Sequence, residues 1–219
     1  MFDAHTHLEG ASEKCWLCAA KEEEWGEVAA RESKNVRVFF GVHPWYAKGG
    51  VGERLEEILR EHPNAGVGEI GLDRLREKTV SSIQRECFIE QLEVASAMRR
   101  VVQLHGAKCW GEVVMLSKRY RDKIPGFVFH GFSRSEGLLG EIFAMNGYVS
   151  VGAAVLNDHA VNYREMVRHL PEERILLETD GSGADLAEIC RKAAALRNTD
   201  ADAFAARIGE NARRLMHDA

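Results

Sequence analysis

The sequence predicts an α/β fold in which eight parallel strands and their crossover helices form a shortened (β/α)8 barrel, a TIM barrel. The chain of 219 residues is close to the lower limit of length for such a barrel. Eight short apolar or β-branched runs recur along it without a clean period of two, as strands buried on both faces do. Stretches of helical period separate most of these runs, which is typical of a parallel sheet with helical crossovers.

The expected strands occupy these eight runs. They are Phe2–His7, Trp16–Ala20, Val36–His43, Ala65–Leu72, Val101–His105, Gly126–His130, Gly147–Gly152 and Arg174–Asp180. The longest expected helix runs from about Val80 to Arg100, where Phe88, Leu92 and Ala95 share one face. Shorter amphipathic stretches around Leu55 and Leu139 indicate further crossover helices.

The connection between the first two runs has no room for a helix. Parallel neighbours usually need a connection of a dozen or more residues, but only Leu8 to Lys14 are available here. Such a segment reaches at most about 25 Å when it is fully extended. We therefore expect an extended segment in place of the first crossover helix. The alternative is an incomplete barrel whose second strand is displaced.

Composition indicates an ordinary globular protein. Apolar residues make up 45% of the chain and charged residues 29%, and no Gly/Ser-rich linker divides it, so we expect a single domain over residues 1–219. No apolar run approaches the roughly 18 residues of a membrane span, and the amino terminus lacks the pattern of a signal peptide. The five scattered cysteines suit reduced thiols, so a cytoplasmic location without membrane contact is expected.

The net charge of −5 is opposite to that of a general polyanion-binding protein. Recognition of a phosphate group would therefore depend on a metal ion or on a small basic patch.

Metal-binding residue types gather at the ends of five predicted strands. They are His5, His7, Glu69, His105, His130 and Asp180. Because all strand carboxyl ends open on one face of a parallel barrel, these side chains are expected to converge there. His5 and His7 are two residues apart on one strand and therefore point the same way.

The mixture of imidazoles and carboxylates limits the choice of ion. Such a set suits zinc, manganese or iron, whereas a site made only of oxygen ligands would favour magnesium. Four histidines and two carboxylates exceed what one catalytic ion usually takes from a protein. Two ions bridged by a carboxylate would use the whole set and would lower the pKa of a bridging water. A buried carboxylate such as Glu69, in a Gly-rich apolar run, is costly unless it is paired.

Five motifs in order along the chain resemble the signatures of TatD-type metal-dependent hydrolases. They are Asp3-Ala4-His5-Thr6-His7-Leu8, Gly41-Val42-His43-Pro44, Gly68-Glu69-Ile70-Gly71-Leu72-Asp73, Phe129-His130-Gly131-Phe132-Ser133 and Leu177-Glu178-Thr179-Asp180. The resemblance implies a TIM barrel of the amidohydrolase kind that holds one or two divalent metal ions (Zn, Mn, Mg or Fe).

The resemblance also implies a role for each ligand. His5, His7 and Asp180 would hold one ion, His105 and His130 would hold the other, and Glu69 would bridge the two. Family members with an assigned activity are mostly deoxyribonucleases or phosphoesterases.

Three departures from the family pattern fall around the expected substrate cleft. Lys108 lies near the place of a usual arginine, Arg134 replaces a usual glycine, and Gly181-Ser182-Gly183-Ala184 replaces a usual Ser-Pro-Tyr-Leu segment. The six ligand positions are intact. His43, Lys108 and Arg134 are the candidate contacts to a substrate phosphate.

The expected function is therefore metal-dependent hydrolysis of an ester bond, a phosphodiester in DNA, by a metal-activated water. Asp180 would be both a ligand and the general base. One alternative is a small-molecule metallo-hydrolase acting on a phosphoester, lactone or amide. The other is a metal-binding barrel with little turnover, serving as an interaction module. The expected partner is accordingly DNA or a small phosphoester.

Overall fold

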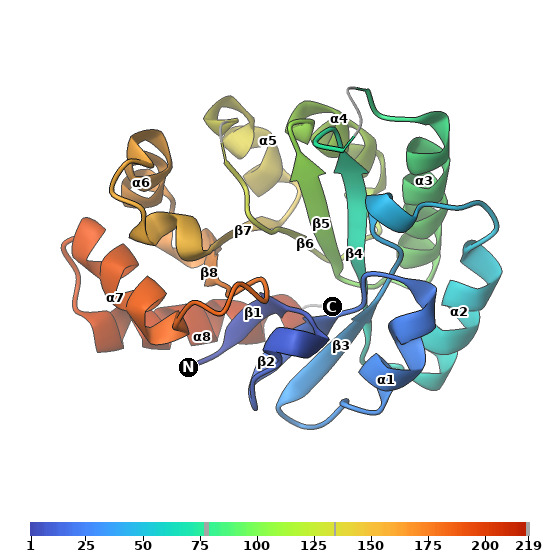
Figure 1. Cartoon of the computed structure of the whole chain (residues 1–219), viewed down its shortest axis with the longest axis horizontal. Helices are drawn as coiled ribbons and strands as arrows, with labels where there is room; N and C mark the ends of the chain where they lie inside the picture. Colours follow the sequence, from blue (N-terminus) through green and yellow to red (C-terminus); the bar gives the residue numbers. More distant parts are fainter. Residues whose placement is uncertain (77–78, 134, 218–219) are drawn as a thin grey trace.

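The computed structural model describes residues 1–76, 79–133 and 135–217, and it contains one sheet of eight parallel strands. The strands are β1 (Asp3–Thr6), β2 (Cys15–Cys18), β3 (Val36–Phe40), β4 (Gly66–Asp73), β5 (Val102–Ala107), β6 (Phe127–Phe129), β7 (Gly147–Val151) and β8 (Ile175–Leu177). Their hydrogen-bonded order follows the chain from β1 to β8 (Figure 1). The predicted parallel barrel is confirmed, and each predicted run overlaps one strand, although β2, β4 and β5 extend beyond the predicted bounds by one or two residues.

The helices cover the outside of the sheet. They are α1 (Trp25–Ala29), α2 (Gly52–Glu61), α3 (Ser82–Ala97), α4 (Trp110–Ser117), α5 (Leu139–Ala144), α6 (Val161–His169), α7 (Leu186–Leu196) and α8 (Ala201–His217). Helices α1 to α6 connect successive strands from β2 to β8, and α7 and α8 follow β8. Helix α3 begins after Ser81, whose hydroxyl accepts a hydrogen bond from the Gln84 backbone N–H at 3.3 Å.

The first connection has no α-helix, as predicted. It is not extended throughout, however, because Leu8–Gly10 form a single 3₁₀ turn. This turn packs against the loop after β8 so tightly that a Cβ on Gly10 would lie 2.8 Å from the Gly181 Cα. The alternative with a displaced second strand is wrong, since Cys15 of β2 pairs with both Asp3 of β1 and Val36 of β3.

The barrel is nearly closed between β1 and the end of β8. The Asp180 backbone N–H donates to the His5 carbonyl at 3.0 Å. The Thr179 hydroxyl donates to the Asp3 carboxylate at 2.6 Å, and its backbone N–H donates to the same carboxylate at 3.1 Å. These bonds fix the segment that carries Asp180 beside the strand that carries His5.

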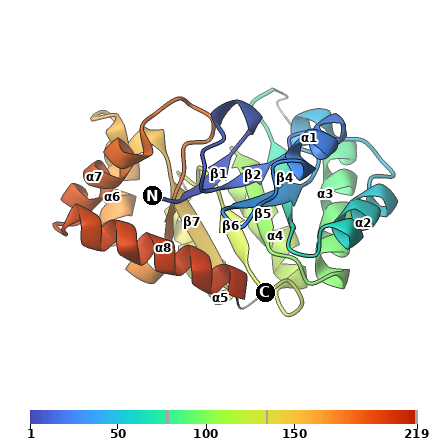
Figure 2. The same cartoon turned by 90° about the horizontal axis from the view of Figure 1, so that it is seen from below.

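Apolar side chains fill two layers, one inside the barrel and one between the strands and the helices. In β2, Trp16 and Cys18 belong to the inner cluster, whereas Cys15 and Leu17 belong to the outer one, as the period of two in a strand requires. Leu215 of α8 also joins the inner cluster, so α8 packs across the amino-terminal end of the barrel (Figure 2). Among the described helices, none is both long and apolar enough to span a membrane.

Candidate metal centre

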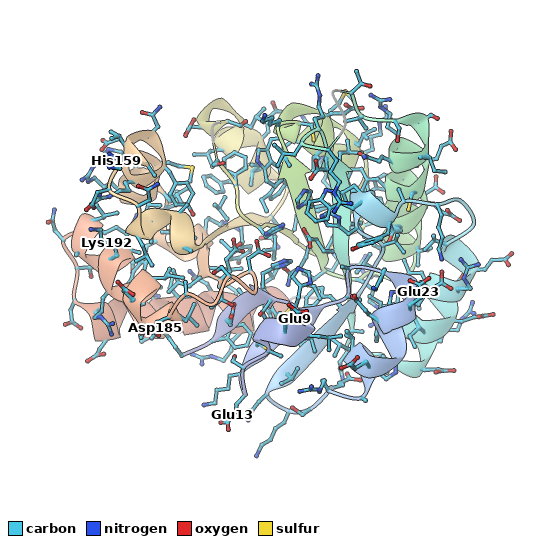
Figure 3. All side chains as sticks on the ribbon, viewed as in Figure 1. Glu9, Glu13, Glu23, His159, Asp185 and Lys192 are labelled. Carbon is cyan, nitrogen blue, oxygen red and sulfur yellow. The ribbon has the colours of Figure 1, made fainter. Side chains whose placement is uncertain are left out.

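The strand register carries the six predicted side chains to one end of the barrel. His5 lies on β1, Glu69 on β4 and His105 on β5. His7 and His130 lie just past the ends of β1 and β6, and Asp180 lies in the loop that follows β8. By contrast, His159 is exposed at the outer edge of the molecule near α6 (Figure 3).

One oxygen of Glu69 faces the two histidines of the first strand. Glu69 Oε2 lies 3.2 Å from His7 Nε2 and 3.6 Å from His5 Nε2. Asp180 approaches the same two nitrogens, with Oδ1 at 3.5 Å from His5 Nε2 and 3.7 Å from His7 Nε2. These four side chains surround one small volume.

The other oxygen of Glu69 faces a second pair of histidines. Glu69 Oε1 lies 2.6 Å from His130 Nε2 and 2.8 Å from His105 Nδ1. His130 Nε2 and His105 Nδ1 are themselves 3.2 Å apart. Glu69 therefore has one imidazole pair at each of its two oxygens.

The electrostatics of this cluster fit divalent cations. Glu69 is only 2% exposed. Burial opposes its ionised form, but the charge of His130 and the contacts with His105 and His130 hold its pKa well below the ordinary value. Burial and the neighbouring His5 lower the pKa of His130, while Glu69 raises it to about 10. Positive charge is thus strongly favoured around the carboxylate.

His5 and His7 each use Nδ1 for a hydrogen bond, so their Nε2 atoms face the centre of the site. His5 Nδ1 lies 2.6 Å from Gln103 Oε1, and His7 Nδ1 lies 3.0 Å from the Cys18 carbonyl. Both acceptors require a proton on Nδ1, which leaves Nε2 as the nitrogen that faces Glu69 and Asp180. His5 Nε2 is buried without a hydrogen-bond partner among the described residues, as is expected for an atom that awaits a metal ion.

Asp73 orients His105 of the second pair. Its side chain is fully buried, and its Oδ2 lies 2.9 Å from His105 Nε2 and accepts a 2.8 Å hydrogen bond from the Trp45 indole N–H. The His105 contact and the Leu75 backbone N–H lower the pKa of Asp73, although burial opposes this. Asp73 therefore holds a proton on His105 Nε2 and leaves Nδ1 facing Glu69.

A fourth carboxylate lies behind His130. Glu178 Oε1 accepts a hydrogen bond from the Gly131 backbone N–H at 2.8 Å, and Glu178 Oε2 accepts one from the Ser150 hydroxyl. His130 Nδ1 lies 3.8 Å from Glu178 Oε1. Glu178 is 1% exposed, and its negative charge favours a proton on His130 Nδ1.

Sequence reasoning missed Gln103 and Asp73 as parts of the site. Asp73 ends the Gly68–Asp73 motif, and an acidic residue at the end of a buried strand was a usable signal. Gln103 carries no such signal, because a glutamine within a strand gives no indication of which side chain it contacts.

The three candidate substrate contacts are placed differently. His43 is 5% exposed, and its Nδ1 accepts a hydrogen bond from the Trp45 backbone N–H at 3.1 Å. Burial lowers the pKa of His43 to about 3, so the ring is neutral and its Nε2–H lies 3.7 Å from Glu69 Oε1. Lys108 is exposed. Arg134 lies outside the described residues.

Two cavities open beside Asp180. A cavity of about 720 Å³ is lined by Asp180, His105, Lys108 and the start of α4. A second cavity of about 200 Å³ is lined by Asp180, Ser182 and Tyr163. Half of the Asp180 side chain is exposed, so a molecule in either cavity can reach it.

The fold and this side-chain cluster define a class of barrel proteins with a histidine–carboxylate centre at the carboxyl ends of the strands. The family model "TatD related DNase" matches residues 17–217. The chain therefore belongs to the TatD-related DNase family.

Curated relatives are similar over part of their length. The "uncharacterized metal-dependent hydrolase YabD" of Bacillus subtilis is 29% identical over 126 residues, which is 58% of this chain and 49% of the relative. The "3′-5′ ssDNA/RNA exonuclease TatD" of Cronobacter turicensis is 31% identical over 162 residues, which is 72% of this chain and 62% of the relative. The matches thus span about half to three fifths of these two relatives.

Solved structures confirm the fold. The TatD homologue YjjV of Escherichia coli superposes with a TM-score of 0.83 at 24% identity, covering 98% of this chain and 96% of that chain. A TatD-family hydrolase of Entamoeba histolytica superposes with a TM-score of 0.77 at 14% identity, covering 93% of this chain and 84% of that chain.

Proposed function

We propose that this protein is a divalent-metal-dependent hydrolase that cleaves a phosphodiester bond in single-stranded DNA. The observation that carries the proposal is the position of Glu69, whose two oxygens each face a separate pair of imidazoles. The family supports a metal-dependent hydrolase, and the relative named as a single-strand exonuclease supports the substrate.

The proposed ligands are the six predicted residues. His5, His7 and Asp180 would hold one ion, His105 and His130 would hold the other, and Glu69 would bridge. Ions bound there would supply Lewis-acid chemistry, lowering the pKa of water and offsetting negative charge on a phosphoryl group.

Asp180 is the proposed general base. Burial raises its pKa, but the contact with His5 and the charge of His130 lower it to about 2. The carboxylate is therefore ionised at neutral pH and faces both cavities, where it can accept a proton from a water molecule that attacks the substrate. Asp180 and the walls of the two cavities would together determine where the substrate and the attacking water lie.

His43 and Lys108 would contact the phosphate of the substrate. The neutral His43 ring presents an N–H toward the centre, and Lys108 brings a cation to the rim of the larger cavity. Both would donate hydrogen bonds to phosphoryl oxygens and stabilise the charge that develops there.

A small phosphoester is the second candidate substrate. The short Gly181–Ala184 loop and the net charge of −5 favour it over a long polyanion. Lactones and amides fit the same metal chemistry and belong in the same test.

A substrate panel tests the proposal. Labelled single-stranded DNA, duplex DNA, bis-p-nitrophenyl phosphate, p-nitrophenyl phosphate, a lactone and an anilide are incubated with the protein and Mn²⁺ or Mg²⁺. Asp180→Asn and a chelator-treated sample are the controls. Metal-dependent cleavage of single-stranded DNA that Asp180→Asn lacks supports the proposal. Turnover of small esters alone supports the second candidate, and no turnover at all favours a metal-binding barrel that acts as an interaction module.

A further inference from the structure

A further cavity, separate from the two beside Asp180, lies at the end of the barrel opposite to the candidate metal centre. It measures about 730 Å³, within the range of small-molecule sites. Its walls come from the segments that precede β1 to β4 and from α8, which packs across this end of the barrel (Figure 2). Nothing in the proposed hydrolysis uses it.

The floor of this cavity is apolar. Phe2 and Trp16 meet edge to face with ring centroids 5.3 Å apart. Helix α8 contributes Met216, Ala212 and the small residues Ala206 and Gly209 to the lining.

Four basic side chains line the same cavity. They are Lys14, Lys34, Arg37 and Arg213. Within residues 1–76, 79–133 and 135–217, no ion pair involves any of the four, although the chain as a whole carries a charge of −5.

Two acidic side chains, Glu32 and Glu210, line the same cavity, and each is paired with another residue. His62 Nδ1 lies 2.5 Å from the Glu32 carboxylate, and Arg207 donates to the Glu210 carboxylate at 2.7 Å. The cavity therefore offers an excess of positive charge next to an apolar floor.

Arg37 is the most enclosed of the four cations. Its side chain is half-buried and makes no hydrogen bond with a described residue. Burial and Arg100 lower the pKa of Arg37, and only the charge of Glu32 opposes them. A carboxylate placed here would form a bidentate, charge-assisted pair with the guanidinium.

We propose that this cavity binds a free fatty-acid-type anion, with its apolar chain over Phe2 and Trp16 and its carboxylate among Lys14, Arg37 and Arg213. The chemistry of the walls favours this occupant, because the apolar floor complements an apolar body and the four cations complement an anionic head. The ligand would join β2 and β3 to α8 and would stabilise the folded protein.

Dodecanoate, below the concentration at which it forms micelles, is the probe. It is titrated into the whole protein while tryptophan fluorescence and Tm are recorded. The expected result is saturable binding of one dodecanoate per chain, a change in tryptophan emission and a rise in Tm. Dodecyltrimethylammonium, with the same chain and the opposite charge, should produce none of these.

Two variants link the binding to this cavity. Lys14→Glu combined with Arg213→Glu changes two exposed side chains and should weaken dodecanoate binding about 10-fold or more, equivalent to about 1.4 kcal/mol. Arg119→Glu, at an exposed side chain in the turn that follows α4 and outside the lining of this cavity, is the matched control and should bind as the unaltered protein does. Arg37→Lys keeps the charge, removes the bidentate geometry and should weaken binding less than the double variant.

Several outcomes would overturn the proposal. Absence of saturable binding, equal binding of the cationic surfactant, or equal affinity in the double variant would each do so. Binding only to anionic lipid vesicles would assign the groove to a membrane surface. A dimer that the double variant abolishes, without dodecanoate binding, would assign it to a second copy of the chain.

Discussion

Glu69 shows how much of the centre depends on a single residue. It lies on a fully buried strand and meets two imidazole pairs through its two oxygens. A carboxylate in such a place is costly without compensating charge, and for this reason the sequence alone singled it out. His5, His7, His105, His130 and Asp180 could be predicted in the same way, because strand ends in a parallel barrel share one face.

Exchanges at Asp180 and Glu69 should have different consequences. Asp180→Asn keeps the size and one oxygen but removes the proton acceptor, so turnover should fall by about 10²–10⁴-fold. Glu69→Ala removes the proposed bridge and should lower metal occupancy as well as rate. Titration with Mn²⁺ separates them, because excess metal should partly rescue Glu69→Ala and should not rescue Asp180→Asn. Full activity of Asp180→Asn would refute its role as the base, and equal rescue of both variants would leave it as a ligand only.

Asp73→Asn should weaken metal binding, although Asp73 is not one of the six proposed ligands. The carboxylate at 2.9 Å from His105 Nε2 fixes the ring and makes Nδ1 more basic. Loss of such a partner commonly costs about 10–100-fold in metal affinity or activity, and competition with a chelator measures it. Asp122→Asn, at a side chain that is 89% exposed, is the control and should change neither quantity.

His43 should make the metal-free protein sensitive to acid. Its pKa of about 3 in the folded chain lies below the ordinary 6.5, so the unfolded chain takes up a proton first as the pH falls. The stability that neutral His43 contributes is complete above pH 6.5 and is lost progressively from there toward pH 3. Between pH 7 and pH 5 the free energy of unfolding should fall by about 2 kcal/mol more in the unaltered protein than in His43→Gln. Urea unfolding of chelator-treated samples measures the difference, and parallel pH profiles would contradict it.

At the scale of elements, the close contact of β4 with β5 holds Glu69 and His105 together. Gly71 has φ +153°, and a Cβ there would lie 2.0 Å from the His105 carbonyl oxygen. Such a contact cannot be relieved by a side-chain rotation, because the neighbour is backbone.

Gly71→Ala should therefore destabilise the protein and displace a ligand strand. A cost of about 2 kcal/mol corresponds to a fall in Tm of about 4–8 °C for a chain of this size. Metal affinity should fall as well. Gly140→Ala in α5, where a Cβ would meet nothing within 4 Å, is the matched control. Equal Tm values for the two variants would contradict the steric account.

The strands were more predictable than the connections between them. Each buried strand leaves an apolar run in the sequence, and the length of the first connection excludes a crossover helix. The 3₁₀ turn at Leu8–Gly10 was not predicted, because it depends on packing against Gly181, far away in the sequence. The cavity beneath the barrel was missed for the same reason, since its walls come from both ends of the chain.

At the scale of the whole molecule, the two ends of the barrel differ in chemistry. The carboxyl end of the strands gathers five imidazoles and several carboxylates around two cavities. The amino end offers an apolar floor beneath unpaired cations. Recognition of the proposed phosphate substrate at the first end would depend on local groups, because the net charge of −5 repels a polyanion.

Metal analysis of the protein, purified without chelator and equilibrated with Mn²⁺ or Zn²⁺ before gel filtration, tests the central claim most directly. The unaltered chain should retain one or two divalent ions per molecule, and Glu69→Ala should retain fewer under the same conditions. If the unaltered protein kept no stoichiometric ion, or if Glu69→Ala kept as many, the six converging side chains would not be a metal centre of the kind proposed here.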